Sequence, residues 1–127
     1  MVSDYVAAVR MAAIHPTRFR VLRYEDLSLD PYKTVSSLLQ FLGVDFHGKV
    51  WDFLDTHTKL DLGGVSSTFR NSKSTPFHWT RDLDFEDVWN IQNECTEAML
   101  HWGYLKANNR SQLMSKEFNP LGEYSIA

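Results

Sequence analysis

One segment of this sequence, residues 18–24, has the pattern of a β-strand, and it limits what the chain can fold into. Phe19, Val21, Leu22 and Tyr24 favour strands, and they place apolar groups on both faces of an extended segment. A strand with two covered faces is typical of a layered α/β sheet with parallel strands. Because one strand cannot form a sheet, we expect this chain to be part of a larger α/β fold.

Charged residues are concentrated at the end of this predicted strand, in the stretch RFRVLRYEDLSLDP. In open α/β sheets, ligands bind beyond the carboxyl ends of the strands. Glu25 and Asp26 have two readings, either as general bases or as carboxylates that cap the next turn or pair with an arginine such as Arg23. The second arrangement is the more frequent one for an acidic pair at a strand end, and it predicts a structural role.

Helical periodicity covers most of the remaining chain. Asp30 and Pro31 are a strong helix start, because a short acidic side chain caps free N–H groups and proline fits the first turn. This helix is expected to end at Gly43, and a final helix is expected from Asp84 to Gly103. Two further helices are predicted, one capped by Ser3 or Asp4 and stopped by Pro16, and a shorter one through Val50, Trp51, Phe53 and Leu54.

Residues 56–82 lack this periodicity and predict a long loop. A loop of this length in a compact domain is usually functional or disordered, and aromatic residues such as Phe69 and Trp79 favour order. The stretch SSTFRNSKSTPFHWTR combines hydroxyl groups and an amide with cations that include Arg70 and Lys73. Such groups bind phosphate oxygens, so the stretch is read either as a phosphate site for a nucleotide or as an ordinary polar loop.

Composition and motifs argue against several classes of function. The 127 residues carry a net charge of -3, which offers no general surface for a polyanion, so we expect no nucleic-acid partner. No run approaches the roughly 18 apolar residues of a membrane span. The sequence contains no P-loop, no paired-glycine dinucleotide motif and no G-x-S-x-G elbow. Its five histidines lack the spacing of a metal site, so we expect no metal.

Two stretches resemble known enzymes. RVLRYEDLSLDPYKTVSSLLQFLGV resembles the strand and helix of the sulfotransferase family, whose members share Y-E-D-L, a proline and a helix that ends in F-L-G. STFRNSKSTPFHWTRDLDFEDVWNIQNECTEAMLHWGY is similar to the C-terminal part of carbohydrate sulfotransferases, especially those that act on carbon 6 of galactose or N-acetylglucosamine. On this resemblance we expect residues 1–105 to be the C-terminal part of a sulfotransferase domain and residues 106–127 to be a polar, flexible tail.

The resemblance implies the C-terminal part of a P-loop-kinase-like α/β fold, here mostly helical with one parallel-type strand and a long loop. It also implies 3'-phosphoadenosine 5'-phosphosulfate as sulfuryl donor, no metal, and a glycan or proteoglycan acceptor. The parent protein would be a type II membrane protein of the Golgi lumen, whose anchor precedes residue 1. Asn109 opens an N-glycosylation sequon that agrees with this location.

By position, the resemblance assigns most donor-binding roles to the long loop. Tyr24 matches a tyrosine near the adenine, and Arg70 matches an arginine that grips the 3'-phosphate. Trp79 matches a loop tryptophan beneath the donor. The same phosphate loop contains Asn71, Ser72 and Lys73, and the stretch that leads into it contains Ser67 and Thr68.

The sequence also departs from the family pattern. The Gly/Ser-rich loop for the 5'-phosphosulfate and an arginine-and-serine segment are absent, and the catalytic base is expected upstream, so the chain alone should be inactive. Thr80 stands where close relatives often have an arginine. The alternative is a catalytically dead domain that binds a nucleotide or a protein.

Cys95, the single cysteine, is either a small core residue or half of a disulfide with an upstream partner. Without the rest of the sheet, apolar helix faces are expected to be exposed and to promote association.

Overall fold

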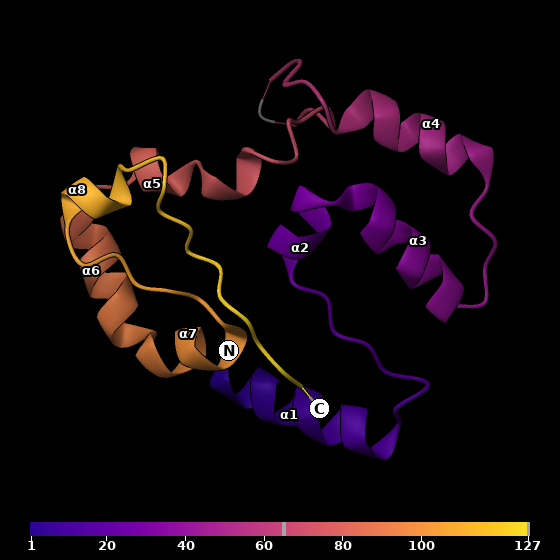
Figure 1. Ribbon diagram of the computed structural model, residues 1–127, viewed down its shortest axis with the longest axis horizontal. Helices are drawn as coiled ribbons and strands as arrows, with labels where there is room; N and C mark the ends of the chain where they lie inside the picture. Colours follow the sequence, from indigo (N-terminus) through magenta and orange to yellow (C-terminus); the bar gives the residue numbers. More distant parts are fainter. Residues whose placement is uncertain (65, 127) are drawn as a thin grey trace. The chain divides into compact units, whose positions relative to one another are not determined.

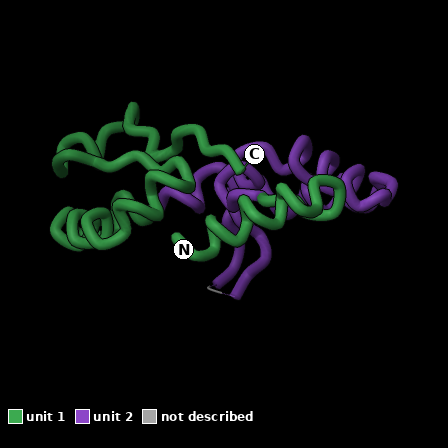
Figure 2. Tube along the Cα trace, turned by 90° about the horizontal axis from the view of Figure 1, so that it is seen from below, with its two compact units in different colours: residues 1–21, 79–127 green, residues 22–78 purple. Residues whose placement is uncertain are grey.

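The computed structural model describes residues 1–64 and 66–126, and the chain divides into two units (Figures 1 and 2). Unit 1 consists of residues 1–21 and 79–127. Unit 2 is the middle of the chain, residues 22–78. The two ends of the sequence therefore share one unit. The predicted loop at residues 56–82 lies largely in the other unit, and contrary to the prediction it contains two short helical segments, Thr75–Phe77 and Trp79–Asp82.

Residues 18–24 do not form the strand that their pattern predicts. Across residues 1–64 and 66–126 there is no strand, and β pairing is limited to two isolated bridges, Leu62 with Phe69 and Tyr104 with Leu121. Tyr24 begins a helix instead. A strand needs a neighbour whose backbone completes its hydrogen bonds, and the described residues provide none for this segment. The predicted strand is therefore wrong, and the described part of the chain is helical (Figure 1).

Unit 2 contains α2 (Tyr24–Leu29), α3 (Pro31–Phe41), α4 (Gly48–His57) and the 3-10 helix η1 (Thr75–Phe77). Helix α3 contacts both α2 and α4, and α2 also contacts η1. The predicted start of α3 is confirmed, because the Asp30 carboxylate accepts a hydrogen bond from the backbone N–H of Lys33 at 3.2 Å. Helix α4 contains the predicted residues Val50 to Leu54 and extends beyond them on both sides.

The predicted end of α3 at Gly43 is also confirmed. Gly43 has a φ of +69°, in the left-handed region that favours glycine. The N–H of Val44 donates to the Leu39 carbonyl at 2.9 Å, and the N–H of Gly43 donates to the Gln40 carbonyl at 3.1 Å. These two bonds form a Schellman motif, which satisfies carbonyls at the helix end.

Unit 1 contains α1 (Val2–Ile14), α5 (Trp79–Asp82), α6 (Phe85–Glu94), α7 (Thr96–Trp102) and α8 (Arg110–Leu113). Helix α1 ends before Pro16 as predicted, but it begins at Val2 without a side-chain cap, so the predicted Ser3 or Asp4 cap is wrong. Helix α1 packs on α7, where the Tyr5 ring stacks on His101 with centroids 4.4 Å apart.

The single helix predicted from Asp84 to Gly103 is divided at Cys95 into α6 and α7. The Thr96 hydroxyl donates to the carbonyls of Gln92 and Asn93 at 2.8 and 2.9 Å. A hydroxyl that bonds back to carbonyls of the preceding turn often bends a helix, and this local chemistry accounts for the break. The predicted start at Asp84 is confirmed, and Gly103 ends α7 with a φ of +70°.

The core of unit 1 is small and includes residues from the end of the chain. Val88, Ala107 and Leu113 are buried, and Trp79, Phe85 and Phe118 pack against them. The Gln92 amide donates to the Ala107 carbonyl at 3.1 Å and accepts from the Ala107 N–H at 2.7 Å. Residues beyond 106, which the sequence predicts as a polar tail, thus contribute to this core. The domain boundary at residue 105 stays a prediction.

Large apolar side chains are widely exposed in both units. Trp51 in unit 2 is 52% exposed and Leu100 in unit 1 is 77% exposed. Among the described residues, no large side chain is fully buried. No helix within those residues combines the length and the apolar character that a membrane span needs.

Candidate anion-binding site

A cleft of about 530 Å³ lies within unit 2, where three segments meet. Residues 29–32, at the junction of α2 and α3, form one part of its lining. Residues 58–59 follow α4, and residues 71–73 form the turn that precedes η1. The cleft therefore brings part of the predicted phosphate loop together with two segments that the sequence does not connect with it.

Backbone hydrogen bonds hold the turn at residues 71–73 against the end of α4. The N–H of Ser72 donates to the Thr58 carbonyl at 2.9 Å. The N–H of Asn71 donates to the Asp61 carboxylate at 3.0 Å, and the Asn71 carbonyl accepts from the Thr75 hydroxyl at 2.8 Å. These bonds satisfy backbone groups within the turn, so the side chains of Asn71, Ser72 and Lys73 remain available to the cleft.

The loop that leads into this turn is held by Ser67. Its hydroxyl donates to the Leu62 carbonyl and accepts from the Phe69 N–H at 3.1 Å. Gly63, with a φ of +84°, lies opposite, where an added Cβ would be 3.2 Å from the Ser67 Cβ. This arrangement closes the loop across the Leu62–Phe69 bridge and gives Ser67 a structural contact.

The cleft is lined by two cations, Lys59 and Lys73, and by one carboxylate, Asp30. No carboxylate within residues 1–64 and 66–126 forms an ion pair with Lys73. Lys59 donates to the Asp55 carboxylate, which also accepts from the Tyr32 hydroxyl at 3.1 Å. The cleft therefore has one unpaired cation and one that is held by a network of three side chains.

This network changes the pKa values of its members. The hydrogen bond from Lys59 is the main reason that the pKa of Asp55 is lowered, and the bond from Tyr32 adds to it. The same ion pair raises the pKa of Lys59. Desolvation is the largest cause of the raised pKa of Tyr32, followed by its bond to Asp55. Across neutral pH, these directions keep Lys59 charged, Asp55 ionised and Tyr32 neutral.

The structure gathers only some of the predicted site residues at the cleft. Asn71, Ser72 and Lys73 line it. The Arg70 guanidinium donates to the backbone carbonyls of Phe69 and Gly64 at 3.1 and 3.0 Å, and its own N–H donates to the His57 carbonyl at 3.0 Å. Ser67 and Thr68 lie in the preceding loop, and Tyr24 is 57% exposed at the start of α2.

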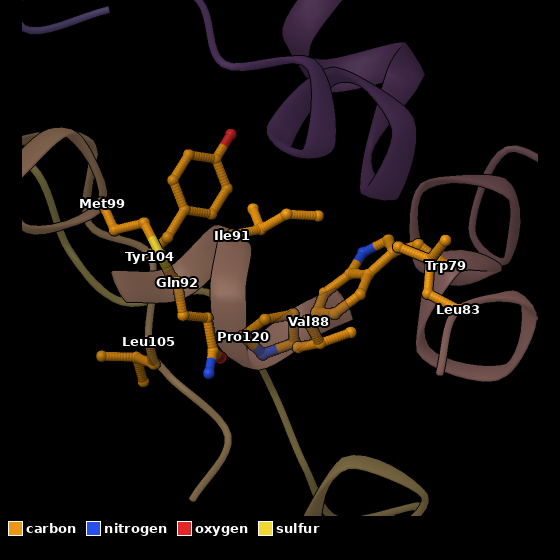
Figure 3. A pocket seen from close by; sticks show the side chains of 9 residues that line it. All are labelled: Trp79, Leu83, Val88, Ile91, Gln92, Met99, Tyr104, Leu105 and Pro120. Atoms are coloured by element: carbon orange, nitrogen blue, oxygen red, sulfur yellow. The ribbon is translucent and has the colours of Figure 1, made fainter. Parts of the chain in front are cut away.

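Trp79, the remaining predicted donor-binding residue, belongs to unit 1. It lines an apolar pocket of about 280 Å³ in that unit. Figure 3 shows side chains of α6 between Trp79 and Leu83 on one side and the side chains of residues 99, 104 and 105 on the other. Because both polar ends of the Gln92 amide already bond Ala107, the pocket has an apolar character.

One acidic residue at the end of the predicted strand, Asp26, has a structural partner. The Arg23 guanidinium binds Asp26 with both nitrogens, Nε to Oδ2 at 3.1 Å and Nη2 to Oδ1 at 2.9 Å. The predicted pairing of the acidic pair with Arg23 is thus confirmed for Asp26.

Within residues 1–64 and 66–126, no group of three or more His, Cys, Asp or Glu side chains could hold a metal ion. Cys95 is a half-buried free thiol.

The site residues that the sequence predicts do not include Lys59, Tyr32 or Asp55. Only the spacing of Asp55 and Lys59, four residues apart, signals a helical ion pair in the sequence. The two ammonium groups, hydroxyls and amide around the cleft are the groups that bind phosphate and sulfate oxygens. Fold and site together thus define a helical domain with a candidate anion-binding cleft.

Comparison with known proteins identifies the family. Residues 2–103 match the sulfotransferase domain, and the chain belongs to the sulfotransferase family. Carbohydrate sulfotransferase 1 of Mus musculus is 30% identical over 117 residues, which are 87% of this chain and 28% of that protein. Carbohydrate sulfotransferase 4 of Mus musculus is 32% identical over 98 residues, which are 75% of this chain and 25% of the relative.

Carbohydrate sulfotransferase 3 of Homo sapiens is 27% identical over 108 residues, covering 84% of this chain and 22% of the relative. The chain thus spans only 22% to 28% of the length of these curated relatives. No solved structure matches the chain.

Proposed function

We propose that this chain is part of a carbohydrate sulfotransferase and supplies one portion of its site for 3'-phosphoadenosine 5'-phosphosulfate. The observation that carries the proposal is the cleft in unit 2, where the turn of residues 71–73 meets residues 29–32 and 58–59. Membership of the sulfotransferase family supports the choice of donor, and the names of the relatives support a carbohydrate acceptor.

In this proposal the 3'-phosphate of the donor occupies the cleft. The uncharged side chains of Ser72 and Asn71 donate hydrogen bonds to its oxygens, and Lys73 supplies a positive charge. Arg70 contributes its guanidinium from the adjoining loop, with Ser67 and Thr68 shaping that loop. Roles for Tyr24 near the adenine and for Trp79 beneath the donor stay predictions.

The proposed reaction is an in-line transfer of the sulfuryl group to a sugar hydroxyl, on carbon 6 of galactose or N-acetylglucosamine. The bond between sulfur and the phosphate oxygen breaks, a bond between sulfur and the sugar oxygen forms, and a general base takes the hydroxyl proton. Positioning and charge stabilisation account for most of the catalysis in such transfers.

The relatives are about four times as long as the matched segment, so we place the base, the acceptor groove and the P-loop-like sheet in the remainder of such a protein. The chain alone is then inactive, because the reacting groups are not held in line.

We further propose that the parent protein works in the Golgi lumen, held there by an anchor outside this chain. Asn109 is compatible with lumenal glycosylation, since it is exposed at the start of α8. Its Oδ1 accepts from the Gln112 N–H at 2.8 Å, and its amide nitrogen is the atom that a glycan would modify.

A second candidate function is a catalytically dead domain that binds a nucleotide or a protein partner. The exposure of large apolar side chains, such as Trp51 at 52% and Leu100 at 77%, favours a protein-binding role. This candidate keeps the family fold but needs no sulfuryl transfer.

The test is calorimetric titration of the folded chain with 3'-phosphoadenosine 5'-phosphate, the product of the donor. We expect saturable binding that Lys73→Gln weakens about fivefold, because one charge-assisted hydrogen bond is lost. Lys49→Gln is the matched control, since it removes the same charge from an exposed position of α4. Absence of binding by the folded wild-type chain, or equal loss in both variants, would contradict the proposal.

A further inference from the structure

Lys59 stands at the cleft on a segment whose backbone is joined to the phosphate turn. It follows α4 directly after Thr58, and the Thr58 carbonyl accepts from the Ser72 N–H at 2.9 Å. Lys59 and Ser72 both line the cleft. Any oxyanion that contacts the Ser72 side chain therefore lies close to the Lys59 segment.

The Lys59 side chain is held by groups from two helices. Asp55, one turn earlier on α4, accepts from the ammonium, and the same carboxylate oxygen accepts from the Tyr32 hydroxyl of α3 at 3.1 Å. Asp55 therefore restrains the position of the ammonium, and Tyr32 restrains Asp55. A long lysine side chain loses rotamer freedom when it binds a ligand, and such restraint reduces that loss on binding.

Restraint does not use up the binding capacity of Lys59. An ammonium has three N–H donors, and the bond to Asp55 occupies one of them. The side chain is 58% exposed, so the other donors are accessible from the cleft.

Among the residues that line the cleft, cations outnumber carboxylates, and Asp55, the partner of Lys59, is not one of the lining residues. Lys59 and Lys73 line it together with a single carboxylate, that of Asp30. This carboxylate accepts from the Lys33 N–H at the start of α3 at 3.2 Å. Phosphate and sulfate esters carry several acceptor oxygens, which suit the ammonium and hydroxyl donors that line this cleft.

We propose that Lys59 is a second anion-binding cation of this cleft, with Asp55 and Tyr32 as the residues that position it. This inference deepens the function proposed above and rests on it for the identity of the natural ligand. Lys59 lies outside the predicted phosphate loop, so the composition of that loop does not indicate it.

The experiment titrates the folded chain with two probes, 3'-phosphoadenosine 5'-phosphate and inorganic phosphate, by calorimetry and by NMR shifts of backbone amides. We expect Lys59→Gln to weaken binding of both probes about fivefold, and Lys59→Arg to retain most of the affinity. Lys49→Gln, the control of equal charge, should weaken them less than about twofold. Both lysines are exposed, so neither variant should unfold the chain.

The positioning role of Asp55 is tested by a double-mutant cycle. Asp55→Asn should weaken phosphate binding by the wild type, because the restraint on Lys59 is lost, but it should change that of Lys59→Gln by less than about 1.5-fold, because Asp55 acts through Lys59. Equal effects of Asp55→Asn in the two backgrounds would overturn that role.

The outcomes separate this inference from the proposed function. If the nucleotide binds, and Lys59→Gln weakens that binding no more than Lys49→Gln does, the inference is overturned and the proposed function stands. Binding of inorganic phosphate through Lys59 without binding of the nucleotide upholds the inference and contradicts the proposed function. Binding of neither probe by the folded chain overturns both.

Discussion

The ring of His57 stacks on the ring of Phe69, with centroids 4.1 Å apart and planes inclined by 19°. His57 is the last residue of α4, and its other face stacks on Phe53, again with centroids 4.1 Å apart. The His57 carbonyl accepts from the N–H of Arg70, the residue after Phe69, at 3.0 Å. This three-ring stack joins the loop before the phosphate turn to α4 and thereby helps to shape the cleft.

Phe69→Ala should destabilise the loop and weaken nucleotide binding. The substitution removes one ring of the stack, at the residue whose backbone forms the bridge with Leu62. Because Phe69 is only half buried, we expect a loss of about 2 kcal/mol in the free energy of unfolding, below the range for a fully buried phenylalanine. Urea denaturation measures the loss, and hydrogen exchange should accelerate at residues 66–72.

Phe53→Ala is the control for this prediction. Phe53 occupies the outer face of the same stack and is 54% exposed, so its removal leaves the contact between His57 and Phe69 intact. We expect a smaller loss, about 1 kcal/mol, and no acceleration of exchange in the loop. If the two variants behave alike, the stack does not hold the loop.

Arg70→Ala should weaken binding of 3'-phosphoadenosine 5'-phosphate roughly tenfold, because a guanidinium forms strong bidentate bonds with phosphate. Arg70→Lys should recover only part of this loss, since an ammonium cannot form the paired bonds. Arg10→Ala, an exposed arginine of α1, provides the control of equal charge. Calorimetry that finds Arg70→Ala equivalent to the control would assign Arg70 a purely structural role, through its bonds to the Phe69 and Gly64 carbonyls.

The ion pair of Asp55 with Lys59 predicts a defined pH dependence of stability. The lowered pKa of Asp55 stabilises the fold above the unfolded value of about 3.9, and this contribution is lost as the pH falls through the lower folded value. The raised pKa of Lys59 stabilises it below the unfolded value of about 10.4, and this contribution is lost as the pH rises through the higher folded value.

The difference in urea midpoint between wild type and Asp55→Asn should therefore be constant between about pH 5 and pH 10 and shrink outside that window. The difference should be small, because the side chains of Lys59 and Asp55 are 58% and 50% exposed. Asp52→Asn, at an exposed position on the same helix, is the control for the loss of one carboxylate. A difference that persists unchanged at pH 2 would argue against the ion pair.

Helix ends could be predicted from the sequence because their signals are local. Asp30 caps α3, and Gly43 ends it, through contacts within five residues. The predicted strand at residues 18–24 was wrong because a strand depends on a neighbour that may lie anywhere in a fold, and the apolar pattern of one segment carries no information about that neighbour. The break at Cys95 was missed because helical periodicity continues through a bend.

The candidate site likewise contains some residues that the sequence indicates and others that it does not. Asn71, Ser72 and Lys73 are adjacent in the sequence, so the composition of one loop was enough to indicate them. Lys59 and Tyr32 lie on different segments and reach the cleft only through the packing of α3 with α4, which no local pattern specifies.

Gly103→Ala should detach the end of the chain from α7. Gly103 has a φ of +70°, and an added Cβ would lie 2.4 Å from the Glu123 carbonyl oxygen, a backbone atom that cannot move aside without disturbing its own segment. That segment is held by the bond from the Gly122 N–H to the Gly103 carbonyl at 2.7 Å. Strain and collision together should lower the free energy of unfolding by about 3 kcal/mol, and protease cleavage near residues 119–126 should increase.

Gly43→Ala separates the two causes of this loss. Gly43 has nearly the same φ, +69°, but nothing lies within 4 Å of its added Cβ. The substitution should therefore cost only about 1 kcal/mol, the strain of a left-handed backbone, and leave cleavage of the chain end unchanged. The difference between the two glycine variants measures how closely residues 122–123 pack on the end of α7. Equal losses in urea denaturation, with no gain in cleavage for Gly103→Ala, would show that this packing contributes nothing to the stability of unit 1.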